Sequence, residues 1–276
     1  MVASSLDERW RDGGTALGAW ISLRDPLLAE VAATAGYDYV CIDMQHGMSD
    51  YTHVTTLLHA IARTPTVPVV RVPWNEQGII GRVLDAGALG VIIPMVNTPE
   101  EARRAVDACR YAPAGTRSFG PLGAGSRYGA GYTGTANDVV ACIPMIETRQ
   151  AVEAVDEILA VPGIDAAYIG PADLSLTYGL PPAVDQEGDP FESALATVVA
   201  ACQRHGVVPG IHANAALAAK RHAAGFRMIT VGLDAWPAIA ALRGDVASAR
   251  AAIDASPAAA QGGDGLDPAE GGGEVV

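Results

Sequence analysis

The chain has 276 residues, of which 50% are apolar and 18% charged, and its formal net charge is −13. An acidic balance argues against a nucleic-acid partner, which calls for a basic stripe. No apolar run is long enough to span a bilayer, and no basic region followed by an apolar run opens the chain. Four scattered cysteines without a Cys-x-x-Cys pair favour a reducing compartment. We therefore expect a cytoplasmic protein that binds neither nucleic acid nor membrane.

Short apolar runs alternate with longer segments of helical pattern along the chain. Asp25-Pro26 and Thr98-Pro99 each place a capping residue before a proline, which is typical of the start of a helix. Eight apolar runs are strand candidates: Gly18–Ser22, Tyr39–Asp43, Val67–Val72, Gly90–Met95, Ala141–Glu147, Ala166–Gly170, Val207–Ile211 and Arg227–Gly232. Strands that alternate with helices predict a parallel sheet in an α/β fold. Eight repeats close most simply into a (β/α)₈ TIM barrel of about 250 residues, with an open doubly wound sheet as the alternative.

Two segments depart from this rhythm. Pro113–Asn137 is rich in Gly, Pro, Ser and Tyr, which predicts a long ordered loop, and loops of that length are usually functional. From about Ser256 the chain is Ala-, Gly- and Pro-rich and acidic. We expect one barrel domain over residues 1–255 and a disordered acidic tail over residues 256–276.

Polar residues follow several of the predicted strands. The active site of a parallel barrel lies at the carboxyl ends of its strands, so these residues should meet at one rim. They are Asp43 and His46 after the second strand, Arg71 in the third, Glu147 after the fifth, Asp173 after the sixth, His212 and Asn214 after the seventh, and Asp234 after the eighth.

Glu147 and Asp173 are the best candidates for metal ligands, because they follow consecutive strands and should be neighbours in space. Two carboxylates, with water and substrate oxygens, make an octahedral site for a hard divalent cation. Each carboxylate taken alone could instead cap a helix or face the N-terminal end of its dipole.

A charged side chain and an imidazole complete the rim. Arg71 ends an apolar strand, so its guanidinium needs an anionic partner, in a structural salt bridge or in contact with a substrate oxyanion. His46 lies three residues after Asp43, a spacing that lets the carboxylate orient the imidazole as a general acid/base dyad.

Lysine supplies a negative argument. Lys220 is the only lysine of the chain, and it falls inside the predicted helix after the seventh strand. An enzyme that works through an imine with a carbonyl substrate needs a desolvated lysine at the rim. Imine chemistry is therefore disfavoured, and a metal ion must take the role of electron sink.

Several motifs in order along the chain resemble the HpcH/HpaI family of metal-dependent 2-keto-acid aldolases. They are Asp43-Met-Gln-His46-Gly, Pro68-Val-Val-Arg71, Leu84-Asp85-Ala-Gly87, Ile146-Glu147-Thr and Ile169-Gly170-Pro-Ala-Asp173-Leu-Ser. The family includes 4-hydroxy-2-oxoheptanedioate and 2-dehydro-3-deoxyglucarate aldolases, and the similarity runs from about Gly18 to Asp234.

The resemblance implies a pyruvate-binding TIM barrel that forms a homo-oligomer, often a hexamer, and uses Mg²⁺, Mn²⁺ or Co²⁺. It implies reversible cleavage of a 4-hydroxy-2-oxo acid to an aldehyde and pyruvate, whose enolate forms on the metal.

The family's functional residues carry over by motif. The metal would sit on Glu147 and Asp173, and the backbone from Gly170 through Pro171 and Ala172 to Asp173 would hold the pyruvate carboxylate. Arg71 would steady the enolate oxygen, and His46 with Asp43 would move the proton of the aldol hydroxyl. Asp85 matches a motif aspartate at the rim or at a subunit boundary.

Two departures leave the substrate open. Met145 stands where relatives of the heptanedioate enzyme carry Gln, and Gln45 stands where many carry an acidic residue.

Two other functions compete with that of a pyruvate aldolase. One is a citramalyl- or malyl-CoA-type lyase, for which the chain offers no basic cluster to bind CoA phosphates. The other is a non-catalytic keto-acid-binding relative, which would not need the intact rim.

Overall fold

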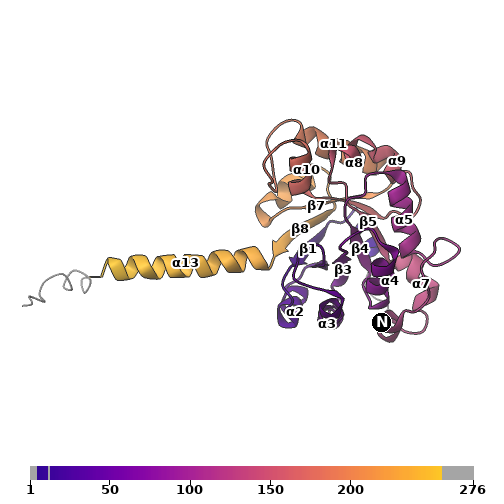
Figure 1. Ribbon diagram of the computed structural model, residues 1–276, viewed down its shortest axis with the longest axis horizontal. Helices are drawn as coiled ribbons and strands as arrows, with labels where there is room; N and C mark the ends of the chain where they lie inside the picture. The colour runs from indigo at the N-terminus through magenta and orange to yellow at the C-terminus, as the bar shows by residue number, and fades with distance from the viewer. Residues whose placement is uncertain (1–4, 12, 257–276) are drawn as a thin grey trace, which may run out of the picture. The chain divides into compact units, whose positions relative to one another are not determined.

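Figure 1 shows the computed structural model of the chain, which describes residues 5–11 and 13–256. Eight parallel strands form its sheet. They are β1 (Ala16–Ile21), β2 (Tyr39–Asp43), β3 (Val67–Arg71), β4 (Gly90–Ile93), β5 (Ala141–Pro144), β6 (Ala166–Ile169), β7 (Val208–His212) and β8 (Met228–Leu233). Each predicted strand is present, with ends that differ by at most a few residues.

The strands form a nearly closed barrel. Their order is β5-β4-β3-β2-β1-β8-β7-β6, and each neighbouring pair in this order is parallel. The outermost strands β5 and β6 meet through a bridge between Met145 and Tyr168, where the Ile146 amide donates to the Tyr168 carbonyl at 2.9 Å. The predicted TIM barrel is confirmed, since an open sheet would leave its first and last strands apart.

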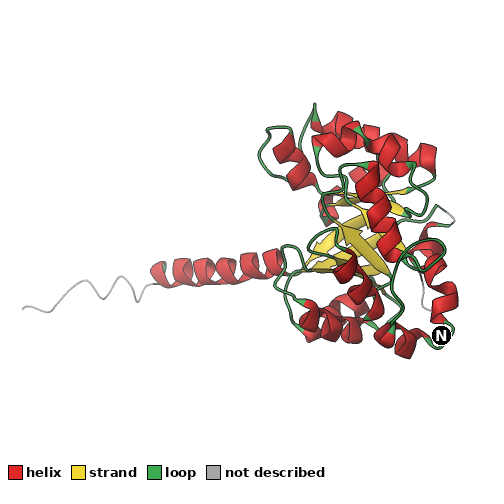
Figure 2. Cartoon of the chain, turned by 45° about the vertical axis from the view of Figure 1, so that its right-hand side comes forward, coloured by secondary structure: helices red, strands yellow, loops and turns green. Residues whose placement is uncertain are grey.

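Helices surround the strands, as Figure 2 shows for the barrel. The Asp25 and Thr98 side chains cap α2 and α5 as the sequence predicts, by accepting from the Leu28 and Glu101 amides. The helices are α1 (Leu6–Trp10), α2 (Pro26–Thr34), α3 (Tyr51–Ile61), α4 (Gln77–Asp85), α5 (Pro99–Cys109), α6 (Leu122–Tyr128), α7 (Tyr132–Val139), α8 (Arg149–Glu153), α9 (Val155–Leu159), α10 (Pro171–Thr177), α11 (Phe191–His205), the 3₁₀ turn η1 (Ala215–Leu217), α12 (Ala218–Ala223) and α13 (Ala235–Asp254).

Two buried clusters share the strand residues by alternation. On β2, Val40 and Ile42 belong to the cluster under the helices, whereas Tyr39 and Cys41 belong to a second cluster. Successive side chains of a strand point to opposite faces, so the second set continues to Asp43. The same alternation carries the other strands to Trp20, Arg71, Met145, Tyr168 and His212, all of which come to one end of the barrel.

The expected long loop over 113–137 is wrong in part, because it contains α6 and most of α7. Ala124, Tyr132 and Ala136 are buried in the second cluster, and the Tyr128 hydroxyl donates to the Gly87 carbonyl at 2.8 Å. Small and aromatic residues at helical spacing therefore bury one face of each helix, which the high glycine content of the segment conceals.

Two compact units divide the chain, Met1–Asp234 and Ala235–Val276. All eight strands lie in the first unit, and α13 belongs to the second. None of the residues of α13 is buried, and Trp236 and Leu242 are among its exposed apolar side chains. Apart from Ser256, the expected tail over 256–276 lies outside the described residues. Within those residues, no helix has the length and apolar character needed to cross a membrane.

Candidate active site

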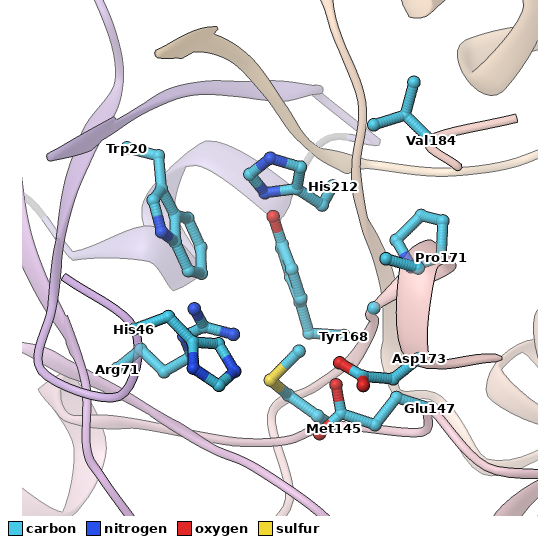
Figure 3. Close-up of a pocket in the computed structure, with 12 residues that line it drawn as sticks. Trp20, His46, Arg71, Met145, Glu147, Tyr168, Pro171, Asp173, Val184 and His212 are labelled. Carbon is cyan, nitrogen blue, oxygen red and sulfur yellow. The ribbon is translucent and has the colours of Figure 1, made fainter. Parts of the chain in front are cut away.

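A pocket opens at the carboxyl ends of the strands, where the sequence predicts the site (Figure 3). Twelve residues line it: Trp20, His46, Arg71, Met145, Glu147, Tyr168, Gly170, Pro171, Ala172, Asp173, Val184 and His212. The predicted metal, substrate and acid/base residues thus share one pocket, except for Asp43, which lies behind Arg71, and Asp85.

Glu147 is a buried carboxylate with one oxygen committed and one free. Its Oε1 accepts from the Met95 amide at 2.8 Å, whereas Oε2 is buried and has no hydrogen-bond partner among the described residues. Met95 holds its amide there from a left-handed backbone conformation, with φ of 56°. Burial raises the pKa of Glu147 to about 7, and the charge of nearby Asp173 adds to the shift.

The pair fits a hard cation. An unpartnered buried carboxylate oxygen is costly unless something positive meets it. Gly170 leaves the space open, because a Cβ there would lie 2.4 Å from Glu147 Oε2. No cluster of three or more His, Cys, Asp or Glu residues within the described ranges could hold an ion. Glu147 and Asp173 would therefore leave coordination positions for water and substrate oxygens, which is how Mg²⁺ is usually bound in enzymes.

Arg71 and Asp43 form a buried two-pronged ion pair. Their strands are in register at these residues, and Arg71 donates from Nε to Oδ1 at 2.9 Å and from Nη2 to Oδ2 at 2.6 Å. Burial alone would raise the pKa of Asp43, but the Arg71 bonds outweigh it and leave that pKa lowered. The guanidinium carbon also lies 4.9 Å from the centre of the Trp20 ring. Arg71 is thus fixed in place with its remaining edge toward the pocket.

The expected side-chain pair between Asp43 and His46 differs from what the structure contains. Asp43 Oδ1 accepts from the backbone amides of Gln45 and His46, at 3.0 and 3.3 Å, and Oδ2 accepts from Trp20 Nε1 at 3.2 Å. Asp43, which also binds Arg71, shapes the loop that carries His46 and makes no hydrogen bond to the His46 ring within residues 5–11 and 13–256. The His46 ring and the Arg71 guanidinium both line the pocket (Figure 3).

The segment after β6 turns directly into α10. Pro171 stands at the first helical position, and Asp173 lies in the first turn. First-turn amides have no acceptor within their own helix, so those of Ala172 and Asp173 are available to an anion at the pocket. The sequence prediction brought Gly170, Pro171, Ala172 and Asp173 to the site, and each lines the pocket.

Asp85 is placed elsewhere. It is the last residue of α4, and its Oδ1 accepts from Arg117 Nη2 at 2.8 Å. A helix that follows a barrel strand runs back toward the opposite end of the barrel, so Asp85 lies far from the carboxyl ends of the strands. Within one chain, its family motif does not bring it to the pocket.

Sequence reasoning missed two aromatic residues of the pocket, Trp20 and Tyr168, and named His212 only as a polar residue at the rim. Trp20 stacks on Tyr168 with ring centres 5.8 Å apart, and the His212 ring meets Trp20 edge-on at 5.0 Å. Burial lowers the pKa of His212 to about 4, and the positive charge of Arg71 adds to the effect. The only signal for Trp20 and Tyr168 in the sequence was their place near strand ends on the inward face, which is also typical of ordinary core residues.

Lys220 stands outside the site, as the sequence predicts. Its Nζ lies 2.8 Å from Asp185 Oδ2 and 3.6 Å from Glu192 Oε1, and the side chain is half-exposed. The chain has no other lysine. An imine with a substrate carbonyl is therefore excluded at this pocket.

Known proteins resemble this chain over most of its length. The family model of the HpcH/HpaI aldolase/citrate lyase family matches residues 16–241. A hydroxypyruvate/pyruvate aldolase of Rhizorhabdus wittichii is 42% identical over 88% of this chain and 97% of its own length. A 4-hydroxy-2-oxo-heptane-1,7-dioate aldolase of Salmonella heidelberg is 38% identical over 84% of this chain and 89% of its own.

A solved structure agrees with these relatives. The crystal structure of an HpcH/HpaI aldolase/citrate lyase family protein from Burkholderia cenocepacia superposes with a TM-score of 0.81, at 38% identity, and covers 89% of this chain and 98% of that one. Fold, pocket and relatives agree. The chain belongs to the HpcH/HpaI aldolase/citrate lyase family and is an aldolase.

Proposed function

We propose that the protein reversibly cleaves 4-hydroxy-2-oxo acids to pyruvate and an aldehyde, with a divalent cation held by Glu147 and Asp173. The observation that carries the proposal is the buried, unpartnered Oε2 of Glu147 in the same pocket as Asp173. In the cleavage direction the C3–C4 bond breaks, the C4 hydroxyl loses its proton to become the aldehyde, and C3 keeps the electron pair as the pyruvate enolate.

The cation, when bound, would supply the positive charge that stabilises the enolate oxygen. Mg²⁺, Mn²⁺ and Co²⁺ all suit two carboxylates with open positions. Arg71 would donate to the same oxygen from its free edge, because Asp43 already orients the guanidinium. The first-turn amides of α10 at Ala172 and Asp173 would hold the pyruvate carboxylate.

His46 would move the proton of the C4 hydroxyl. It lines the pocket from the loop after β2, and Asp43 holds this loop through backbone amides. This arrangement replaces the orienting contact between Asp43 and the imidazole that the sequence predicts. Asp43 would position Arg71 and the loop, and His46 would act on the hydroxyl directly or through one water.

We also propose a homo-oligomer. The exposed apolar side chains of α13, among them Trp236, Leu242 and Val246, support association, because large apolar patches on a protein surface mark interaction sites. The relatives named as aldolases do not favour a CoA lyase or a catalytically silent relative.

Metal dependence tests the proposed reaction. The protein is stripped with EDTA, and pyruvate release from a panel of 4-hydroxy-2-oxo acids is measured before and after addition of Mg²⁺, Mn²⁺ or Co²⁺. We expect release only with a metal. Exchange of pyruvate methyl protons in D₂O follows enolate formation separately, without an aldehyde. A folded protein that neither releases pyruvate nor exchanges these protons with any metal would refute the proposal.

A further inference from the structure

The pocket has two chemically different ends. Figure 3 shows the Glu147 and Asp173 carboxylates together at one side and His212 at the other, beyond the Tyr168 ring. Because pyruvate would occupy the carboxylate end, the second substrate must approach from elsewhere in the pocket. His212 and Val184 line this second part.

His212 is held rigidly by an aromatic wall. It is the last residue of β7, and its ring lies edge-on against Trp20 at 5.0 Å. Trp20 is itself fixed, since it stacks on Tyr168 and donates from Nε1 to Asp43 at 3.2 Å. The imidazole therefore packs against a fixed ring while it lines the pocket, which favours preorganised binding.

Within residues 5–11 and 13–256, neither ring nitrogen of His212 has a hydrogen-bond partner. The Tyr168 hydroxyl points toward His212 in Figure 3, but it hydrogen-bonds to Thr230 Oγ1. The His212 side chain is partly exposed in the pocket, so a ligand that displaces solvent there must hydrogen-bond a ring nitrogen or leave it unpaired. The His212 imidazole is thus the group at this end of the pocket that a ligand donor or acceptor can pair with.

The charge state of the His212 ring limits which chemical groups of a ligand it can bind. Burial and Arg71 keep the pKa of His212 near 4, so the imidazole is neutral at physiological pH. A neutral imidazole carries one N–H donor and one acceptor nitrogen. It therefore suits an alcohol or carbonyl oxygen, and it offers no counter-charge to a carboxylate or a phosphate.

We propose that His212 selects the acceptor aldehyde by hydrogen bonding to a neutral oxygen one or two carbons beyond the reacting carbonyl. The enzyme then prefers hydroxyaldehydes to alkyl aldehydes of the same length. This inference rests on the proposed pyruvate aldolase reaction and names its second substrate class. An aldehyde without the oxygen leaves the ring nitrogen unpaired, which is the strongest basis for rejecting a small substrate.

The test compares matched aldehydes in the aldol direction with metal-loaded, full-length enzyme. Lactaldehyde and propanal differ only in the C2 hydroxyl, and 3-hydroxypropanal places it one carbon further. For the wild type we expect kcat/KM for the better hydroxyaldehyde to exceed that for propanal by roughly 10- to 100-fold, the range of one hydrogen bond to an otherwise unpaired group. In His212→Phe the ratio should fall to about one, and His212→Asn, which keeps a donor and an acceptor, should restore part of it.

Val184→Ala is the matched control, because it widens the same end of the pocket without removing a polar group. It should change kcat/KM for both aldehydes together. A wild-type ratio near one for both hydroxyaldehydes, or an unchanged ratio in His212→Phe, would overturn the assignment; the wild-type measurement stands even if a variant does not fold. Pyruvate methyl exchange by the wild type separates the outcomes, since its absence would indicate failure of the proposed reaction.

Discussion

Two buried arginines, each paired with a carboxylate, lie at opposite ends of the barrel and differ in how many of their donors the protein occupies. At the amino end, Arg110 donates to the Val140 and Gly163 carbonyls and to Asp165 at 2.6 Å, so its donors meet protein oxygens. At the carboxyl end, Arg71 donates from two nitrogens to Asp43 and lines the pocket with its remaining edge.

The two carboxylates respond in opposite directions. Burial raises the pKa of Asp165, and Arg110 with the Cys142 amide only partly offsets it. Burial acts on Asp43 as well, but Arg71, Trp20 and the loop amides lower its pKa below the usual value. The bonds around Asp43 hold Arg71 at the pocket, where the proposed reaction would use its free edge, whereas those around Asp165 join neighbouring strands and loops.

Removal of the charge on Glu147 should have the largest effect. Glu147→Gln keeps the shape of the side chain and its acceptor for the Met95 amide, but removes half of the proposed ligand set. We expect pyruvate release to fall below detection at any metal concentration that saturates the wild type. The melting temperature without metal should hold or rise, because a buried charge disappears. Turnover that persists in this variant would show that the cation binds elsewhere.

Matched Arg→Lys changes separate the two pairs. Lysine keeps the charge but loses the planar fork of donors. Arg71→Lys should lower kcat/KM by roughly 10²–10³-fold, the usual effect of losing a preorganised donor to a developing oxyanion. Arg110→Lys should instead lower the free energy of unfolding by about 1–3 kcal/mol, because the Val140 and Gly163 carbonyls lose donors, while kcat/KM of the folded enzyme stays within about twofold. Steady-state kinetics and urea unfolding are measured for both variants. Equal losses of kcat/KM in the two variants would contradict the different roles assigned to Arg71 and Arg110.

The smallest effect concerns acid stability. Because the folded-state pKa of Asp43 is lowered, its contribution is present above its unfolded pKa of about 4 and is lost as the pH falls. Asp165 behaves oppositely: its raised pKa makes the charged form unfavourable at higher pH, and this penalty fades on acidification. Asp43→Asn should therefore flatten the fall in melting temperature between about pH 5 and pH 3, and Asp165→Asn should not. Thermal melts across this range, without metal, compare the slopes; a wild-type slope in Asp43→Asn would contradict the assignment.

The fold could be predicted from the sequence because the buried parallel strands are continuous apolar runs. The pocket could be predicted in part for a related reason. Glu147, Asp173 and Arg71 are charged residues at the ends of such runs, so each stands out locally. The Asp43–Arg71 pair follows from strand register, which the residues alone do not reveal before the sheet order is known.

The remaining site residues give no local signal. Trp20 and Tyr168 look like core residues in apolar strands, and only the closed barrel brings them against His212. The predicted contact between Asp43 and the His46 ring failed for a related reason. Spacing in the chain cannot show that Arg71, on another strand, competes for both carboxylate oxygens. Asp85 shows the same limit, since a motif match does not say at which end of a barrel its residue lies.

Met95 shows how such a site constrains evolution through a residue whose side chain does no chemistry. Its left-handed backbone, with φ of 56°, aims the amide that holds Glu147 Oε1. Glycine and asparagine adopt this conformation readily, whereas valine, isoleucine and threonine resist it strongly. Replacement of Met95 by glycine or asparagine should therefore keep this backbone, whereas replacement by an apolar β-branched residue would displace the proposed metal ligand Glu147. At this position the backbone φ angle, rather than the chemistry of the side chain, decides which substitutions the protein tolerates.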